Sequence, residues 1–249
     1  HERTFAVKKT LDLKTCEEVL SKYGFKCKPE NMSTKIVNVY EIVKKVAQRF
    51  KLAVPKIVVA NTMLPNAAAS GPSPSYGVML ITTGLLVQLE DDEIVSVVGH
   101  EFGHFKGRDP LALFGLTAAE FLLRVYVFWP FLFLLGDFSV FFGYLYLFIA
   151  LSAVYFIAKF FESRADLESA IKVGQPKVLA EALRKIGFRR LQFERIPAYK
   201  FQEWIQWDPH PPIYFRVSRL DKLQDPDKIK HPLIQSVKDN IKGFLSVLG

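Results

Sequence analysis

The sequence is 249 residues long and half hydrophobic, which excludes a disordered chain and supplies enough apolar side chains for a sizeable core. Much of its aromatic content lies between Leu111 and Phe161, more than a soluble domain of ordinary composition requires. The formal net charge of +8 suits acidic lipid or nucleic acid, but net charge reports long-range attraction without naming a partner. We interpret it as a contribution to solubility and expect no nucleic-acid partner.

Two features of the sequence bear on its cellular context. Only Cys16 and Cys27 are present, neither has the spacing of a metal site, and no pattern supports a disulfide between them. A reducing compartment is therefore expected. The sequence starts at His1 without a leader of the signal-peptide kind, so we expect a fragment or a processed product.

The first expected elements are a helix and two strands. Between residues 33 and 50, apolar side chains recur at three- and four-residue spacing, which predicts a core-facing amphipathic helix capped by Ser33 or Thr34. Apolar runs at residues 56–60 and 76–82 predict strands that flank a Pro- and Ser-rich turn. Together they indicate a small sheet with an exposed edge.

A further helix is predicted by its end signals. After a short helix at residues 84–89, the acidic residues 91–93 suit a helix N-terminus. Gly107 and Pro110 end the segment that follows. This helix contains the strongest chemical motif of the chain.

The motif is HEFGH at residues 100–104, a match to HExxH. Residues four apart on a helix project from one face, so the imidazoles of His100 and His104 can reach a single ion. Glu101 lies on the adjoining flank, where its carboxylate can serve as the general base of a metallopeptidase. Chance is the alternative, but burying two unpaired imidazoles would cost free energy. We therefore predict one Zn²⁺ per chain.

Two long apolar stretches predict a transmembrane helical hairpin. Residues 138–158 carry no charge and, as a helix, are long enough to cross a hydrocarbon core of about 30 Å. Residues 111–135 are nearly as apolar but contain Glu120 and Arg124, which lie four apart and can pair on one helix face. Gly136 and the residue after it would form the turn. A hairpin buried in a soluble protein is the alternative.

A catalytic zinc needs three protein ligands, so one more must come from outside the motif. Glu162 and Asp166 follow the hairpin directly and share a helix face, one able to bind metal and the other to orient an imidazole. The alternative is a solvated acidic pair at the membrane boundary.

The C-terminal part returns to ordinary soluble composition. A helix is expected at residues 177–185, followed by a last amphipathic segment at residues 233–248. Its apolar stripe can pack in the core or lie on a membrane surface, and core packing is the interpretation we favour.

Three segments together resemble the HtpX-like membrane zinc peptidases of the gluzincin group, relatives of the type I CAAX prenyl proteases: residues 66–71, 100–104 and 162–166. The similarity runs from about residue 33 to about residue 220. It implies that Glu162 is the third ligand, from an E-x-x-x-D motif after a membrane hairpin, and that Asp166 supports the ligands. The chain lacks the family's usual N-terminal membrane portion and is too short for the many-helix chamber of the prenyl proteases, which favours the HtpX-like branch.

The resemblance also implies roles for two further segments. The family's N-A-F-A-T-G strand, which pairs with the substrate backbone, corresponds here to Asn66, Ala67, Ala68, Ala69, Ser70 and Gly71, with Ala68 in place of Phe and Ser70 in place of Thr. The family's H-P-P-x-x-x-R segment corresponds to residues 210–216, so His210 would stabilise the transition state and Arg216 would support the metal ligands. From the residues alone, His210 is equally well explained as a surface-loop residue.

The resemblance implies a mainly helical α+β fold, a zincin-like peptidase domain with a small edge-exposed sheet, an HExxH helix and an inserted transmembrane helical hairpin. Residues 1–110 and 162–249 would form the two halves of the peptidase domain, with the hairpin at residues 111–161 between them.

The expected activity is zinc-dependent hydrolysis of peptide bonds in membrane-associated or misfolded proteins, with the polypeptide bound as an added β-strand. CAAX-type prenyl protease activity, or a silent membrane adaptor with a structural metal, are the alternatives. Glu101 argues against the adaptor, since a structural metal needs no general base. The expected location is the cell membrane, multi-pass, with the bilayer as partner. Basic residues flank the hairpin and are absent from its turn, which places the active site on the cytoplasmic face.

Overall fold

The computed structural model describes residues 35–248, so Cys16, Cys27 and the expected helix cap at Ser33 or Thr34 lie outside the described residues. The chain divides into two units, residues 1–41 and residues 42–249. Apart from the start of its first described helix, every element below belongs to the second unit. The fold is mainly helical with one small mixed sheet, as the sequence predicts.

The first described helix, α2 (Val39–Phe50), begins later than the apolar spacing predicts. Asn38 precedes it, and the Asn38 side-chain oxygen accepts a hydrogen bond from the backbone N–H of Glu41 at 3.1 Å. This hydrogen bond makes Asn38 the N-cap of the helix. The position of an N-cap depends on local side-chain hydrogen bonding, which the spacing of apolar residues does not reveal. Its buried face is apolar and consists of Val43, Val46, Ala47 and Phe50.

The sheet has three strands, β1 (Lys56–Ala60), β2 (Ala67–Ser70) and β3 (Val78–Thr82), in the order β1-β3-β2. β1 pairs parallel with β3, and β2 pairs antiparallel with it. β2, at residues the family resemblance marks as an edge strand, therefore lies at one edge of the sheet. The turn after it needs a glycine, because Gly71 has a φ of 114° and a Cβ there would lie 2.7 Å from the Gly77 Cα.

After α3 (Thr83–Gln88), helix α4 (Asp91–Gly107) contains the HExxH motif. A capping box fixes its start, with the Glu90 backbone N–H donating to the Glu93 carboxylate at 2.8 Å. Arg108, in the left-handed conformation with a φ of 53°, ends the helix and leads the chain into the next one.

A glycine stripe brings α4 close to α7 (Ser139–Val173). Gly99, Gly103 and Gly107 are spaced four residues apart, so they lie on one face of α4, and each contacts residues of α7. A Cβ added at Gly103 would lie 2.8 Å from the Ala165 Cα, and one at Gly107 would overlap the Arg164 side chain. This close approach places residues 162–166 against the histidines of α4.

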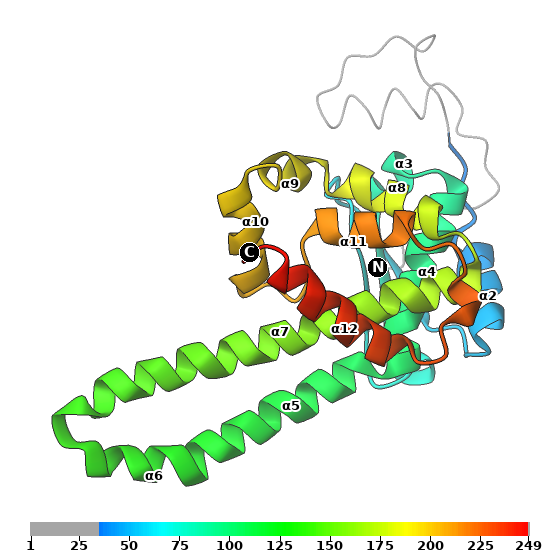
Figure 1. Cartoon of the computed structure of the whole chain (residues 1–249). Coiled ribbons are helices and arrows are strands. Elements are labelled where there is room, and N and C mark those ends of the chain that lie inside the picture. Colours follow the sequence, from blue (N-terminus) through cyan, green and yellow to red (C-terminus); the bar gives the residue numbers. More distant parts are fainter. Residues whose placement is uncertain (1–34, 249) are drawn as a thin grey trace, which may run out of the picture. The chain divides into compact units, whose positions relative to one another are not determined.

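The apolar stretches form a helical hairpin, α5 (Asp109–Leu123), η3 (Arg124–Phe128), α6 (Trp129–Leu132) and η4 (Phe133–Phe138) leading out and α7 returning (Figure 1). Gly136, with a φ of 53°, makes the turn. Glu120 and Arg124 form the predicted ion pair at 3.1 Å. Within the described residues, one helical stretch, Asp109–Val173, is long and apolar enough to cross a membrane, and none of its most apolar window is buried. That exposure disfavours a hairpin buried in a soluble core.

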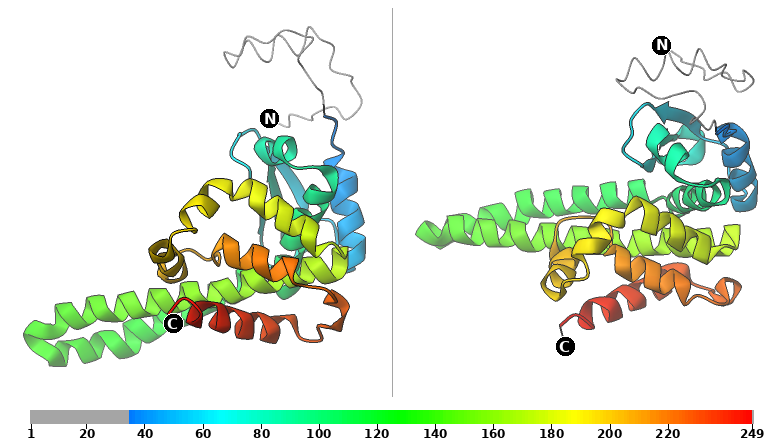
Figure 2. Two further views of the ribbon diagram at one scale, coloured as in Figure 1. Left: turned by 45° about the horizontal axis from the view of Figure 1, so that its top comes forward. Right: turned by 90° about the horizontal axis from the view of Figure 1, so that it is seen from above.

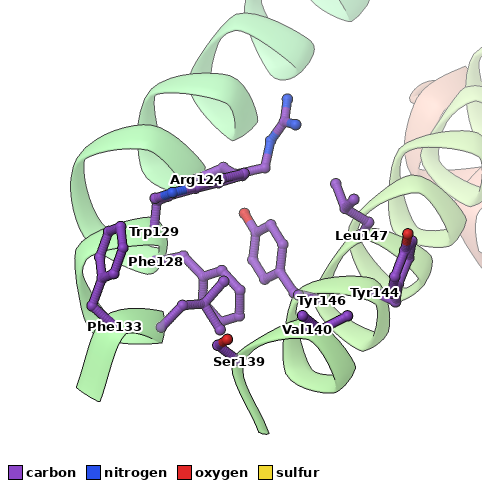
Figure 3. A pocket seen from close by; sticks show the side chains of 11 residues that line it. Arg124, Phe128, Trp129, Phe133, Ser139, Val140, Tyr144, Tyr146 and Leu147 are labelled. Carbon is purple, nitrogen blue, oxygen red and sulfur yellow. The ribbon is translucent and has the colours of Figure 1, made fainter. Parts of the chain in front are cut away.

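Near its turn the hairpin encloses a cavity of about 390 Å³ (Figure 3). The cavity lies between the arms, and five of its eleven lining residues are aromatic, with the Phe128 and Tyr146 rings stacked at 3.9 Å. Arg124 is the single cation that lines it. No residue of the HExxH motif contributes to this cavity.

The C-terminal part adds α8 (Pro176–Ile186), α9 (Phe188–Phe193), α10 (Pro197–Ile205), α11 (Ile213–Asp221), η5 (Pro226–Lys228) and α12 (Pro232–Leu245). α8 lies against α4 and α11, and α12 lies along α7 (Figures 1 and 2). The prediction that the apolar stripe of the last helix packs in the core is wrong. The buried residues of α12 are Ser236 and Asn240, whereas most of its large apolar side chains are exposed.

Candidate metal centre

Two helices supply a cluster of potential metal ligands. His100 and His104 project from one face of α4, and Glu162 projects from α7. The two Nε2 atoms are 3.1 Å apart, and they lie 3.4 and 3.3 Å from the two oxygens of Glu162. One ligand atom from each residue falls within 4.8 Å of the others. The structure thus brings together the three residues that the sequence proposes as ligands.

Asp166 lies behind His100. Its Oδ1 atom is 2.9 Å from His100 Nδ1, and its carboxylate accepts two bonds from Arg216, at 2.9 and 2.7 Å. An ionised carboxylate only accepts, so this contact suits a proton on Nδ1 of His100, which would leave Nε2 to offer a lone pair to a metal. The structure places Asp166 and Arg216 where the sequence and the resemblance proposed them.

Asp109 lies behind His104 in the same way, and sequence analysis missed it. Its Oδ2 atom is 2.8 Å from His104 Nδ1 and accepts a bond from Arg164 at 2.5 Å. Arg164 also donates to the Gly103 carbonyl at 3.0 Å. Each imidazole therefore has a carboxylate within 2.9 Å of its Nδ1 atom, and an arginine binds that carboxylate in turn. Asp109 lies five residues beyond His104, and only the left-handed turn at Arg108 brings it back to the imidazole.

The electrostatics of the cluster suit a cation. Burial alone would lower the pKa of His100 and His104, but the surrounding carboxylates outweigh it and raise both. Burial would raise the pKa of Glu162, but the nearby imidazoles hold it well below its usual range. Arg216 likewise lowers the pKa of Asp166 against the effect of burial. The carboxylates stay ionised and attract positive charge to the point where the three ligands meet.

Glu162 has a buried oxygen atom that a metal could satisfy. Glu162 Oε2 makes no hydrogen bond of normal length to any described group, since its neighbours are His100 Nε2 at 3.4 Å and the His210 and Arg216 side chains at 3.7 Å each. A buried carboxylate oxygen without a partner is unfavourable. Two imidazoles and a carboxylate are the donor set of many catalytic zinc sites, so these residues fit Zn²⁺.

The structure places two candidate catalytic residues next to this cluster. Glu101 follows the first ligand on α4 and is buried. His210 lies on the loop between α10 and α11, half-exposed, with Nε2 3.7 Å from Glu162 Oε2. Asp208 accepts bonds from its Nδ1 and from its backbone N–H, both at 2.8 Å. Sequence analysis missed Asp208, whose contact depends on the local turn.

Comparison with known proteins identifies the family of this chain. The sequence model of peptidase family M48 matches residues 34–224. The chain belongs to peptidase family M48. It is similar to proteins named "Protease HtpX homolog": 35% identical over 226 residues to one from Methanopyrus kandleri, covering 79% of this chain and 69% of that protein. A second, from Moorella thermoacetica, is 33% identical over 166 residues, covering 59% of this chain and 54% of that protein.

The matches cover only part of the length of these relatives. The chain spans about half the length of the Moorella thermoacetica relative, and a match of 40% identity to the Thermodesulfovibrio yellowstonii homologue covers only 32% of that protein. The family match ends at residue 224, so α12 lies beyond it.

In this M48 member the edge strand lies beside the helix that carries the two candidate imidazole ligands. α4 contacts β2, whose register opposite β3 runs from Ala67 to Ser70. Asn66 holds the start of β2, because its N–H donates to Thr82 Oγ1 at 2.8 Å and its carbonyl accepts from the Thr82 N–H at 3.0 Å. No described strand pairs with the other edge of β2.

Proposed function

We propose that this chain is a zinc-dependent endopeptidase of the HtpX type, anchored in a membrane by its helical hairpin. The observation that carries the proposal is the orientation of the two imidazoles. Each one turns its Nε2 atom toward Glu162, while a second carboxylate lies against its Nδ1 atom. A chance grouping of charged residues would not arrange two imidazoles in the same tautomer around one carboxylate.

Glu101 acts as the general base and then as the general acid. When bound, Zn²⁺ would lower the pKa of a water and polarise the scissile carbonyl. Glu101 takes a proton from the attacking water and delivers it to the nitrogen of the departing amine. Burial of Glu101 keeps bulk water from competing for that proton.

His210 stabilises the charge that develops on the carbonyl oxygen. Asp208 contacts Nδ1 of His210 at 2.8 Å and holds the imidazole with Nε2 toward the cluster, where a protonated Nε2 can donate to the carbonyl oxygen. The half-exposed position of His210 on the open side of the cluster leaves room for a substrate.

The substrate would bind as a strand added to β2. An extended peptide there would pair with the free edge through main-chain hydrogen bonds, which give affinity with little sequence preference. A peptide paired with residues 66–71, next to α4, would have its scissile bond near Glu101. Broad acceptance of this kind suits the removal of misfolded or membrane-associated proteins.

The hairpin at residues 111–161 would be the membrane segment, with the flanking parts forming one peptidase domain. Lys106 and Arg108 precede it and Arg164 follows it, whereas the turn at Gly136 carries no positive charge, so both ends would face the cytoplasm. In intact cells a membrane-impermeant thiol reagent should label Asp137→Cys and spare Arg108→Cys, in a background with Cys16 and Cys27 replaced. The reverse labelling would overturn this orientation.

Digestion of an unfolded protein such as casein tests the catalytic part. We expect cleavage by the zinc-loaded chain, loss of cleavage with a chelator, and no cleavage by Glu101→Gln, which keeps the shape of the side chain without its basicity. Zinc content measured on the same samples should be unchanged in Glu101→Gln. Equal turnover in the two proteins would refute Glu101 as the base.

A further inference from the structure

The outer faces of α10 and α12, with Trp207 just after α10 and Leu248 just after α12, expose an apolar surface that neither the metal centre nor the core uses. The side chains that form it, here called the collar, are Phe201, Ile205, Trp207, Ile241, Leu245 and Leu248. Leu245 and Leu248 are 57% and 56% exposed, and Ile205 and Trp207 are 50% and 49% exposed. Exposed apolar groups gathered in this way mark an interaction surface.

The two helices of the collar lie together. The Phe201 ring of α10 stacks with the Phe244 ring of α12 at 6.4 Å, and Gly243 allows the approach because its Cα faces the Phe215 and Trp204 rings. Each view places the C-terminal end of α12 beside α10 (Figures 1 and 2). The collar is therefore one surface made by two elements.

The collar is attached to the returning arm of the hairpin. Trp207 contacts Phe148 at 6.0 Å between ring centroids and donates from its indole N–H to Ser152 Oγ at 3.1 Å. Phe244 contacts Phe156 at 5.6 Å. The apolar surface of the hairpin thus continues onto α10 and α12 without an intervening polar layer at these contacts.

The position of these contacts along α7 sets the depth of the collar. At about 1.5 Å per residue, Phe148 lies about 14 Å and Phe156 about 26 Å from the start of α7 at Ser139. A hydrocarbon core is about 30 Å thick. In a bilayer that the hairpin spans from its turn, the contact at Phe156 lies near the far boundary of the hydrocarbon core and the contact at Phe148 lies within the core, so the collar enters the bilayer from that boundary.

The charges next to the collar suit acidic headgroups. Lys238 and Lys242 lie on α12 beside the exposed stripe, and neither forms an ion pair with another described residue. On α10, Lys200 stacks over the Tyr214 ring at 5.2 Å and likewise has no acidic partner among the described residues. Apolar side chains bordered by lysines are the pattern of helices that lie in the lipid interface.

We propose that the collar is a membrane-binding surface, which inserts its apolar side chains between acidic lipid headgroups around the base of the hairpin. This inference rests on the proposed membrane anchoring and adds a second contact to it. Trp207 precedes His210 by three residues, a separation of about 10 Å at most. The collar would hold the metal centre at the lipid surface, so that the preferred substrates are segments emerging from the bilayer.

Depth-dependent fluorescence quenching tests the collar. The full chain, with Cys16 and Cys27 replaced by Ser, would carry an environment-sensitive fluorophore at Leu245→Cys, at Phe141→Cys in the hairpin, or at Val87→Cys on α3. Vesicles of phosphatidylcholine and phosphatidylglycerol in equal parts would contain lipids brominated along the acyl chain. We expect strong quenching at positions 245 and 141 and several-fold weaker quenching at position 87.

The hairpin label separates the two hypotheses. Quenching at position 141 but not at position 245 would overturn the collar and leave the anchoring intact, whereas no quenching at position 141 would refute the anchoring itself. Replacing Lys238 and Lys242 by Gln should reduce quenching at position 245 in acidic vesicles by more than the matched pair Lys172→Gln and Lys177→Gln. Equal effects of the two pairs would refute the role of acidic lipid.

Discussion

Asp109 Oδ2 lies 2.8 Å from His104 Nδ1, and Asp109 is also the first residue of α5, the outgoing arm of the hairpin. Glu162 and Asp166 lie on α7, the returning arm. Each arm therefore carries at least one carboxylate that contacts an imidazole of the cluster directly. Because the carboxylates of the two arms face the same pair of imidazoles, a displacement of either arm changes the geometry of the cluster.

Replacing Asp109 by Asn should weaken zinc binding by about 10–100-fold, the usual effect of removing a carboxylate that holds a ligand imidazole. The amide keeps the shape but loses the charge that favours the Nδ1 proton of His104. Competition with a chromophoric chelator measures the affinity. Asp166→Asn should act similarly on His100, and Asp137→Asn, in the hairpin turn, should have no effect. Wild-type affinity in Asp109→Asn would show that the contact is structural only.

Gly103→Ala should destabilise the protein by about 1–3 kcal/mol, the usual effect of overpacking. The new Cβ would lie 2.8 Å from the Ala165 Cα, and a backbone atom cannot move aside as a flexible side chain can. Separation of α4 from α7 should weaken zinc binding as well. Gly115→Ala is the matched control, because a Cβ there meets nothing within 4 Å. Chemical denaturation in detergent compares the variants, and equal stabilities would refute the close approach.

The features that could be predicted from the sequence are those that depend on residues close together in the chain. The spacing of His100 and His104 on a helix, the charge-free stretch of the returning arm, and Glu162 just after it all follow from periodicity and residue type. Asp109 and Asp208 were missed because each reaches its imidazole through a turn, which periodicity does not describe. The exposed apolar stripe of α12 was mistaken for a core face. Amphipathicity predicts that an apolar face is buried, but it does not distinguish burial in the protein core from burial in lipid.

Glu162→Ala should lower both zinc content and turnover, since it removes one of three proposed ligands. The substitution also changes the surroundings of His100 and His104, which would lose a buried carboxylate that lies within 3.4 Å of both imidazoles. Elemental analysis after dialysis against zinc measures occupancy. Glu168→Ala is a suitable control because that carboxylate, on the same helix, pairs with Lys106. Full zinc occupancy in Glu162→Ala would identify another residue as the third ligand.

His210→Ala should reduce turnover while zinc is retained, because the side chain is proposed to donate to the transition state and not to the metal. Loss of one such donor costs about 3 to 4 kcal/mol, a factor of roughly 10²–10³ in kcat. Asp208→Asn should have a smaller effect in the same direction, since the amide holds the His210 imidazole less firmly than the carboxylate does. In His210→Ala the Asp208→Asn change should have little further effect, because its partner is gone. Full additivity of the two substitutions would mean that Asp208 acts elsewhere, for example through Arg190, which donates to it at 2.9 Å. Unchanged turnover in His210→Ala would return His210 to the role of a surface-loop residue.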